Sequence, residues 1–303
     1  MDRYIIVSPC YNEENVISIF LSELETIFSK TNYSFLVIMV NDCSLDSTIN
    51  ILNNFRFKSN NYELKVLDLK YNIGHQGAIK QGLIYASKFN ALGYIVMDSD
   101  GEDNPEAIIK MIEMKSFEII FVSRGKRKES FSFKVGYFLY KILFKIISGN
   151  SINFGNYSII NKTVLNAIIR QDFDHYSAFL SKLKFNKLFI KSDRRKRIDG
   201  KSKMKLSNLV FHGLNSLIEY SEELLFFFIR ILLFVVLLFI IFGGYVVYSI
   251  LLSNTAIPGW ASTMAMSLIN SILIISGIIV LGLLLVSNRN RNNYKYDHYS
   301  NEN

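Results

Sequence analysis

The sequence predicts an α/β domain built on a Rossmann-like parallel sheet, followed by a hairpin of two transmembrane helices. Two observations carry this prediction. Short apolar runs alternate with amphipathic stretches over the first 125 residues, which is the pattern of strands and helices wound into a parallel sheet. No charged residue occurs between Ile231 and Ser287, a length sufficient for two membrane crossings of about 20 residues each.

Five apolar runs are expected to form the strands, namely residues 4–7, 35–40, 64–69, 94–97 and 119–122. The amphipathic stretches between them predict helices over residues 13–29, 47–54, 76–89 and 105–114. Ser47 is a suitable N-cap for the second helix, and Pro105 suits the first turn of the fourth. Residues 133–147 predict one more amphipathic helix, which either lies in the membrane interface or covers the sheet.

Two apolar segments, residues 231–252 and 264–286, are predicted to cross the cell membrane. Basic residues flank this pair but are absent from the loop inside it, so both chain ends and the first domain are expected to be cytoplasmic. The expected organisation is a cytoplasmic domain (1–205), an amphipathic juxtamembrane helix (206–230), the two spans (231–287) and a disordered cytoplasmic tail (288–303). Packing between two-span anchors makes a homo-oligomer a further expectation.

Charge is unevenly distributed along the 303 residues, whose formal net charge is +8. Residues 1–120 carry 10 basic and 16 acidic side chains, whereas residues 121–230 carry 21 basic and 8 acidic ones. A basic region next to a membrane suits anionic lipid headgroups and phosphates, and the lack of an aromatic-basic recognition motif argues against nucleic acid. The two cysteines, Cys10 and Cys43, indicate a reducing compartment and a packing role.

Asp98 and Asp100 directly follow the apolar run 94–97. Two carboxylates at positions i and i+2 of an extended segment share a face, and they repel each other unless a cation lies between them. The pair therefore predicts a site for a divalent metal and a nucleotide. On the pair alone, the alternative is a solvated acidic turn that caps the helix beginning at Pro105.

Polar clusters follow four of the predicted strands, at residues 8–14, 41–47, 71–77 and 98–103. Because loops at the carboxyl ends of parallel strands meet at one edge of a sheet, we expect these clusters to form one crevice.

The clusters and one basic segment resemble, in order, the motifs of glycosyltransferase family 2. They read PCYNEE at residues 9–14, VNDCSLDST at 40–48, NIGHQGA at 72–78, DSDGEDNPE at 98–106 and RIDGKSK at 197–203. The last segment and the two spans narrow the resemblance to polyprenyl-phosphate glycosyltransferases, relatives of dolichol-phosphate mannose synthase. The resemblance covers residues 4–287.

The resemblance implies a GT-A fold and inverting transfer of a hexose from a nucleotide sugar, here a UDP-sugar, to undecaprenyl phosphate or another polyprenyl phosphate. It implies that Asp98 and Asp100 hold Mg²⁺ or Mn²⁺ against the donor diphosphate, and that Arg124 and Arg127 take catalytic basic positions. Contacts to the nucleotide are expected from Pro9, Tyr11, Glu14, Asp42, Gly74, Gln76 and Ser99, and contacts to the acceptor phosphate from Arg197, Ser202 and Lys203.

The chemistry of several of these residues agrees with the implied roles. Asp42 can accept the imide N–H of a uracil ring, Tyr11 can lie against the base, and Glu14 can hold the ribose. Gly74 and Gly77 permit close approach of the backbone to an anion. Oxygen-only ligands at the acidic pair argue against zinc.

The chain departs from the family at two positions. Glu102 stands where relatives usually carry Gln, and its charge either strengthens metal binding or alters the sugar pocket. Residues 155–158 read GNYS where relatives often read GDFR, so Asn156 cannot remove a proton; Asp172 or Asp174 could substitute, although no spacing indicates it. An ionised phosphate acceptor needs positioning and desolvation more than a strong base.

Two other functions fit parts of the sequence. One is a transferase that acts on another lipid, such as a diacylglycerol, or on a growing glycan. The other is a catalytically inert membrane scaffold, which Asn156 and Glu102 would favour. His75 is expected to be a solvated loop histidine, and the basic residues at 194–196 are expected only to attract the membrane.

Overall fold

The computed structural model describes residues 2–114, 116–124, 142, 144–147, 149, 154–193, 195, 197, 198, 216, 218–249, 259–291 and 299–302. The chain forms two compact units. The first comprises residues 1–141, 151–219 and 295–303, and it is a mixed α/β domain. The second comprises residues 142–150 and 220–294, and it contains a pair of long helices.

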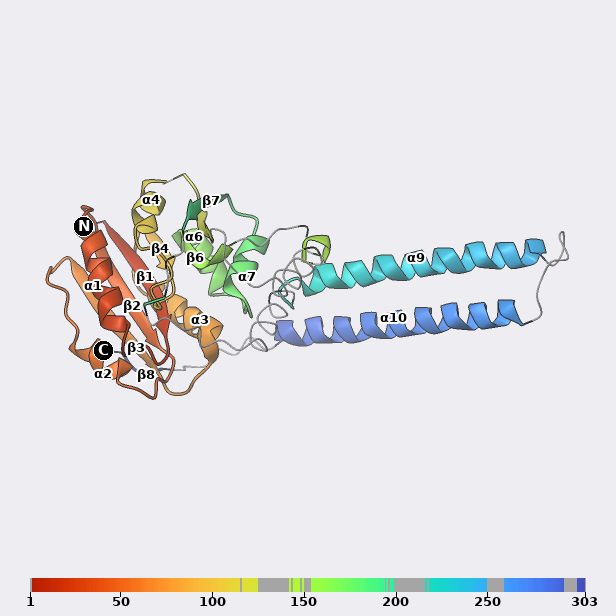
Figure 1. Cartoon of the computed structure of the whole chain (residues 1–303), viewed down its shortest axis with the longest axis horizontal. Coiled ribbons are helices and arrows are strands. Elements are labelled where there is room, and N and C mark those ends of the chain that lie inside the picture. The colour runs from red at the N-terminus through yellow and green to blue at the C-terminus, as the bar shows by residue number, and fades with distance from the viewer. Residues whose placement is uncertain are drawn as a thin grey trace. The chain divides into compact units, whose positions relative to one another are not determined.

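One eight-stranded sheet runs through the α/β domain (Figure 1). Its strands are β1 (Arg3–Cys10), β2 (Ser34–Asn41), β3 (Tyr62–Leu69), β4 (Gly93–Val96), β5 (Ile119–Arg124), β6 (Phe154–Ile160), β7 (Lys187–Ser192) and β8 (Tyr299–Glu302). Their order in the sheet is β7-β5-β6-β4-β1-β2-β3-β8. Strands β4, β1, β2 and β3 are parallel to one another, whereas β6 is antiparallel to both β4 and β5, and β8 is antiparallel to β3.

Helices cover both faces of this sheet. Helices α1 (Ile17–Phe28), α2 (Thr48–Asn54) and α4 (Ala107–Glu113) pack on one face, and α3 (Gly74–Ala86), α6 (Lys162–Ile168) and α7 (Tyr176–Lys182) pack on the other. Alternate strand residues serve the two cores: Ile6 of β1 faces α1, whereas Ile5 and Val7 face α3. Because both faces are buried, these strands read as continuous apolar runs in the sequence.

The five predicted strands and four predicted helices are all present, with ends shifted by a few residues. The five predicted strands all run in the same direction, and an additional strand that the sequence did not predict, β6, inserts between β4 and β5 in the antiparallel direction. Strand β6 contains the polar residues Asn156 and Ser158, both buried on the α3 side, so it does not read as an apolar run. The predicted helix over residues 133–147 lies mostly outside the described residues.

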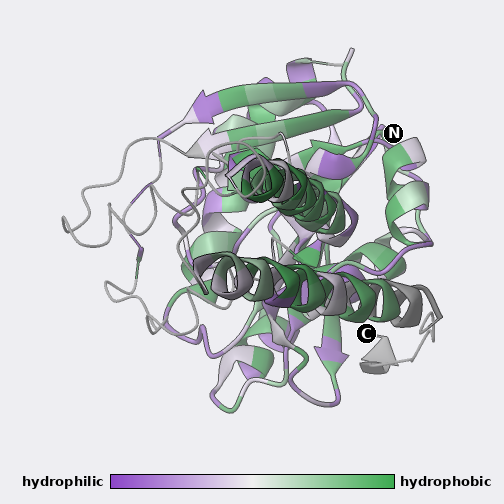
Figure 2. Cartoon of the chain, turned by 90° about the vertical axis from the view of Figure 1, so that its right-hand side faces the viewer, coloured by the Kyte–Doolittle hydropathy of each residue, from purple (hydrophilic) through white to green (hydrophobic). Residues whose placement is uncertain are grey.

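Two long helices, α9 (Ser221–Tyr248) and α10 (Trp260–Arg291), lie side by side in the second unit. Both are long and apolar enough to cross a membrane, and the most apolar 18-residue stretch has a mean hydropathy of 3.3 in Ser221–Tyr248 and of 2.4 in Trp260–Leu284. None of their most apolar stretch is buried inside the protein, and Figure 2 shows hydrophobic residues along both helices. Helices that are apolar all round and unburied in their own chain are candidates to span a membrane.

The bounds of these helices differ from the predicted ones. Helix α9 begins at Ser221 rather than at residue 231, because Glu222 and Glu223 stabilise its first turn and Arg230 does not interrupt a helix. The last ten residues of the expected juxtamembrane segment, 221–230, therefore belong to α9. The tail expected to be disordered contains β8, which pairs with the open edge of β3 through backbone bonds that need no apolar run.

Asp46, rather than the predicted Ser47, caps the start of α2. The backbone N–H of Thr48 donates to Asp46 Oδ1 at 3.0 Å, and the N–H of Glu14 donates to Asp46 Oδ2 at 3.2 Å. Ser47 occupies the N-cap position without a side-chain cap bond. Burial alone would raise the pKa of Asp46, but the hydrogen bonds from Thr48 and Glu14 hold it below its usual value.

Replacing Asp46 by Ala is therefore expected to lower the free energy of unfolding by about 1 kcal/mol, whereas Ser47→Ala has almost no effect. Thermal unfolding of the full chain in detergent should show a decrease of about 2–4 °C for the first variant only. Because the folded pKa is depressed, the Asp46 contribution is present at neutral pH and is lost as the pH falls through that pKa. Equal losses for the two variants would contradict this assignment of the cap.

Candidate active site

Four loops meet at the carboxyl edge of β1, β2, β3 and β4, as the sequence predicts. The N–H of Leu45 donates to Asn12 Oδ1 at 2.8 Å, which joins the loops after β1 and β2. The N–H of Ile73 donates to Asp42 Oδ1 at 2.8 Å, which joins the loops after β2 and β3. Ser99 Oγ donates to the Pro9 carbonyl at 2.8 Å and joins the loop after β4 to β1. These bonds fix the shape of one continuous edge.

Three residues predicted to contact a nucleotide lie on the β1 and β2 side of this edge. Tyr11 is 41 % exposed, so its ring is accessible to a base. Asp42 is buried; burial raises its pKa, and the hydrogen bond from Ile73 opposes that rise. Glu14 Oε2 accepts the N–H of Ser47 at 3.0 Å, so a ribose would have to use the other carboxylate oxygen.

The remaining predicted nucleotide contacts also have partners within the protein. Gln76, in the first turn of α3, accepts the N–H of Tyr176 through Oε1 at 2.7 Å and so links α3 to α7. Gly74 has a φ of +79°, a backbone conformation that L side chains rarely adopt, and its N–H donates to Asn72 Oδ1 at 3.1 Å. Ser99 and Pro9 bond to each other as described above.

The Asp98 and Asp100 carboxylates lie close together in a tight turn after β4. The N–H of Asp98 donates to Asp103 Oδ2, and the N–H of Glu102 donates to Asp100 Oδ1, both at 3.0 Å. Burial raises the pKa of Asp100, and the charge of Asp98 raises it further. The first N–H groups of α4 have other partners than this pair: those of Ala107 and Ile108 donate to the carbonyls of Asn104 and Pro105, at 3.1 and 3.0 Å.

Arg197 lies against this acidic turn. Its Nη2 is 3.0 Å from Asp100 Oδ2, and its Nε donates to Glu102 Oε1 at 3.0 Å. The side chains of Asp100 and Glu102 are each only 14 % exposed. Glu102, the departure from the family pattern, thus accepts a hydrogen bond from Arg197. The sequence did not indicate this partner. Ser202, Lys203 and Arg127 lie outside the described residues, and Arg124 is the last residue of β5.

The segment around Arg197 is fixed by further contacts. The guanidinium of Arg195 forms a bidentate ion pair with Glu23 of α1, with N···O distances of 3.1 and 2.6 Å. The backbone N–H of Arg195 donates to the Glu102 carbonyl at 3.0 Å. Gly101 has a φ of +77°, and a Cβ there would lie 2.6 Å from Ile198 Cδ1. The expectation that Arg195 only attracts a membrane is therefore wrong.

His75 is a site residue that the sequence analysis missed. Its Nε2 lies 3.1 Å from Asp98 Oδ1 and 3.0 Å from Asn156 Nδ2, so it has the carboxylate partner that a solvated histidine would lack. Burial alone would lower the pKa of His75, but the charge of Asp98 raises it above its ordinary value. The separation of 23 positions between His75 and Asp98 hides this contact in the sequence.

The amide of Asn156 is best oriented with its oxygen toward His75. As placed, His75 Nε2 would have to accept a hydrogen bond from the Asn156 amide nitrogen and donate one to Asp98, which a single ring nitrogen cannot do. If the O and N atoms of the Asn156 amide are exchanged, the Nε2–H of His75 can donate to both Asp98 Oδ1 and the Asn156 oxygen. As placed, Asn156 Oδ1 is a buried atom with no hydrogen-bond partner, and the exchange gives this oxygen the Nε2–H of His75 as a donor. Asn156 therefore orients His75 and takes no proton.

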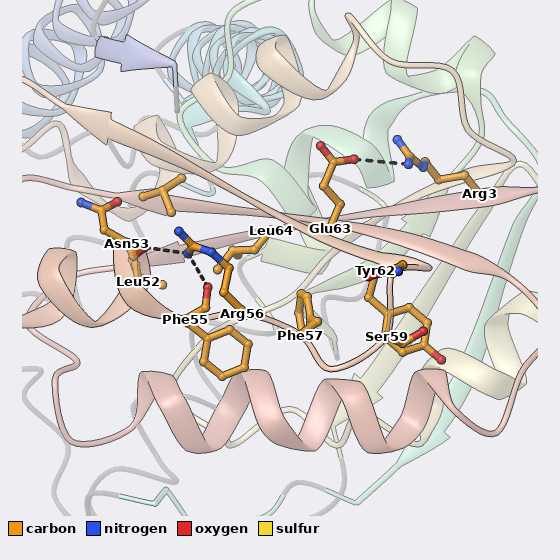
Figure 3. Close-up of a pocket in the computed structure, with 12 residues that line it drawn as sticks. Arg3, Leu52, Asn53, Phe55, Arg56, Phe57, Ser59, Tyr62, Glu63 and Leu64 are labelled. Atoms are coloured by element: carbon orange, nitrogen blue, oxygen red, sulfur yellow. Dashed lines mark hydrogen bonds and ion pairs between the residues drawn. The ribbon is translucent and has the colours of Figure 1, made fainter.

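A hollow also lies away from this edge. It has a volume of about 720 Å³ and is bounded by the loop before β3 and by Arg3 at the start of β1 (Figure 3). Its charged groups are already engaged: Arg3 pairs with Glu63 at 3.2 Å, and Arg56 donates to the carbonyls of Asn53 and Phe55. The titratable groups of the carboxyl edge are clustered instead, which makes that edge the candidate active site.

A family model for glycosyl transferase family 2 matches residues 5–176, more than half of the chain. The chain belongs to glycosyl transferase family 2. The match ends at Tyr176, the first residue of α7, so it includes all four loops of the edge and excludes Arg197.

Full-length relatives agree with this membership. The chain is 28 % identical to an uncharacterized glycosyltransferase of Bacillus subtilis (YkcC), with 91 % of this chain and 87 % of the relative covered. It is 25 % identical to a prophage bactoprenol glucosyl transferase homolog of Escherichia coli, with 92 % and 90 % covered.

Solved structures support the same fold. The glucosyl-3-phosphoglycerate synthase of Mycobacterium tuberculosis, in complex with Mn²⁺, UDP and glucosyl-3-phosphoglycerate, superposes with a TM-score of 0.52 at 11 % identity. The alignment covers 73 % of this chain and 79 % of that one. The family 2 domain is therefore a GT-A-like mixed α/β fold, as the sequence predicted.

Proposed function

We propose that this family 2 chain transfers a hexose, with inversion, from a UDP-sugar to a polyprenyl phosphate such as undecaprenyl phosphate at the cytoplasmic membrane face. The proposal rests on one arrangement: the Asp98 and Asp100 carboxylates, flanked by His75 and Arg197, at the loop edge of the sheet. The bactoprenol-named relative and the two apolar helices favour a membrane lipid acceptor. The UDP complex of a GT-A neighbour favours the donor class.

The acidic pair suits Mg²⁺ or Mn²⁺. Mg²⁺ is usually bound by one or two carboxylates together with substrate phosphates and water, and oxygen-only ligands do not favour zinc. Among the described residues no group of three or more His, Cys, Asp or Glu side chains is placed to hold a metal, so diphosphate oxygens would complete the shell. A bound ion would neutralise charge on the leaving diphosphate.

The chain's own residues position the reactants. A phosphate oxygen of the acceptor forms the bond to the anomeric carbon while the bond from that carbon to the donor diphosphate breaks, so UDP leaves and the configuration inverts. The acceptor oxygen is already ionised, so the lack of a carboxylate at Asn156 removes no required proton acceptor. His75 holds its Nε2 proton between Asp98 and Asn156, and this fixes the direction of the Asp98 carboxylate.

Purified full-length chain, incubated with a panel of UDP-sugars, Mn²⁺ or Mg²⁺ and undecaprenyl phosphate, is expected to form one lipid-linked hexose, identified by mass spectrometry. Chelation of the metal with EDTA should stop product formation, and readdition of Mn²⁺ should restore it. A failure to form glycolipid from any donor would reject the proposal. Transfer only to a diacylglycerol or a glycan would change the acceptor, and calorimetry without metal-dependent UDP binding would favour an inert scaffold.

A further inference from the structure

Asp100 has no vacant oxygen in this structure. Its Oδ1 accepts the N–H of Glu102, and its Oδ2 faces the guanidinium of Arg197 at 3.0 Å. A divalent cation at Asp100 would therefore lie next to a fixed positive charge in a nearly buried setting, where like charges repel strongly. Arg197 and a metal ion compete for the same carboxylate.

The side chain of Arg197 can leave Asp100 without detaching its segment. Arg195 keeps the segment in place through its ion pair with Glu23 and its N–H bond to the Glu102 carbonyl. Ile198 covers Gly101 on the other side of Arg197. Glu102 Oε1, which accepts from Nε, would hold the stem of the side chain while the terminal nitrogens turn away.

We infer that Arg197 is the internal counter-ion of Asp100 in the ligand-free protein, and that binding of the metal with the donor transfers its guanidinium to the acceptor phosphate. The inference rests on the proposed function and adds an order of binding to it, in which the metal and donor release Arg197 for the acceptor phosphate. Guanidinium groups bind phosphate oxygens bidentately, so the released Arg197 is suited to this acceptor. Glu102 is a positioning residue that keeps Arg197 at the site during the exchange.

The exchange couples the two substrates. If the metal and donor release Arg197, they raise the affinity for the acceptor phosphate, and by linkage the acceptor raises the affinity for the metal and donor by the same factor. A residue that only stabilised the fold would produce no such coupling.

Arg197→Gln and Arg195→Gln form a matched pair, because each removes one positive charge from the same segment and only Arg197 contacts Asp100. Mn²⁺ binding without nucleotide is measured by electron paramagnetic resonance on the full chain in detergent. Loss of a cation within hydrogen-bond distance is expected to tighten Mn²⁺ binding about tenfold in Arg197→Gln. In Arg195→Gln the change should stay below about twofold, since the backbone N–H bond to the Glu102 carbonyl and the contact of Ile198 with Gly101 still hold the segment, and exposed charges farther away are screened.

The second measurement is calorimetric binding of farnesyl phosphate, with and without Mn²⁺ and UDP. The wild type should bind this probe more tightly when Mn²⁺ and UDP are present, and Arg197→Gln should lose that increase. Equal Mn²⁺ affinity in Arg197→Gln and wild type, or equal coupling in the two, would overturn the inference and leave the proposed function intact. A wild type that binds Mn²⁺ and UDP but makes no glycolipid would instead reject the proposed function.

Discussion

Replacing Asp98 or Asp100 by Asn is expected to reduce transferase turnover by at least about a hundredfold. Metal ions stabilise developing charge by several kcal/mol, and about 1.4 kcal/mol corresponds to each tenfold in rate. Asn retains an oxygen that can accept a hydrogen bond but lacks the charge that attracts a divalent cation. Activity should therefore fall because the metal and donor bind poorly, which radiometric glycolipid assays at several Mn²⁺ concentrations would reveal as a loss that added Mn²⁺ partly restores.

The same two variants should remain folded. Asn at position 100 still accepts the N–H of Glu102, which closes the turn. Removal of one charge also ends the repulsion that raises the pKa of Asp100, so the lost ion pair with Arg197 is partly offset. The control is Glu106→Gln. This substitution also removes one negative charge after β4, but from an exposed side chain whose partner is Lys30, at 3.9 Å. Wild-type turnover in either Asp variant, or an equal loss in the control, would remove the metal role from the pair.

The parts of the fold that the sequence predicted are those set by local pattern. Strands β1, β2 and β4 are buried on both faces, so they appear as apolar runs with polar residues at their carboxyl ends. Because parallel strands have their carboxyl ends at the same edge of the sheet, the polar clusters could be predicted to lie at one edge. The site residues after these strands, such as Asp42 and Asp98, could be named for the same reason.

The parts that were missed depend on contacts between distant segments. Strand β6 is recognisable only by its place between β4 and β5, since two of its buried residues, Asn156 and Ser158, are polar. His75 reaches Asp98 because α3, which packs on β1 and β2, begins beside the carboxyl end of β4, a placement that no local pattern specifies. Arg197 meets Glu102 across 95 residues of sequence, so the family departure at Glu102 had no visible partner.

The substitution Gly82→Ala is expected to destabilise the α/β domain by about 2 kcal/mol. A Cβ at Gly82 would lie 2.7 Å from Val40 Cγ2 and closer still to Val7 Cγ1, and both valines are fully buried in central strands. Overpacking of this kind costs about 1–3 kcal/mol, and two facing strands leave no room for relaxation. Ala is more favourable than Gly inside a helix by about 1 kcal/mol. Subtracting this gain from an overpacking cost of about 3 kcal/mol leaves a net destabilisation of about 2 kcal/mol.

Gly77→Ala separates the steric cost from the gain in helix propensity. Gly77 lies in the same helix, so its replacement by Ala brings the same gain in helix propensity. Its Cβ would meet only the side chain of Ile73, at 3.0 to 3.3 Å, and that flexible, partly exposed side chain can move. The midpoint temperature of thermal unfolding in detergent should drop by about 4–8 °C for Gly82→Ala. For Gly77→Ala it should stay near the wild-type value or rise. If both variants were stabilised, α3 would not be fixed against β1 and β2. The position of His75 beside Asp98 depends on that packing, since α3 carries His75 in its first turn.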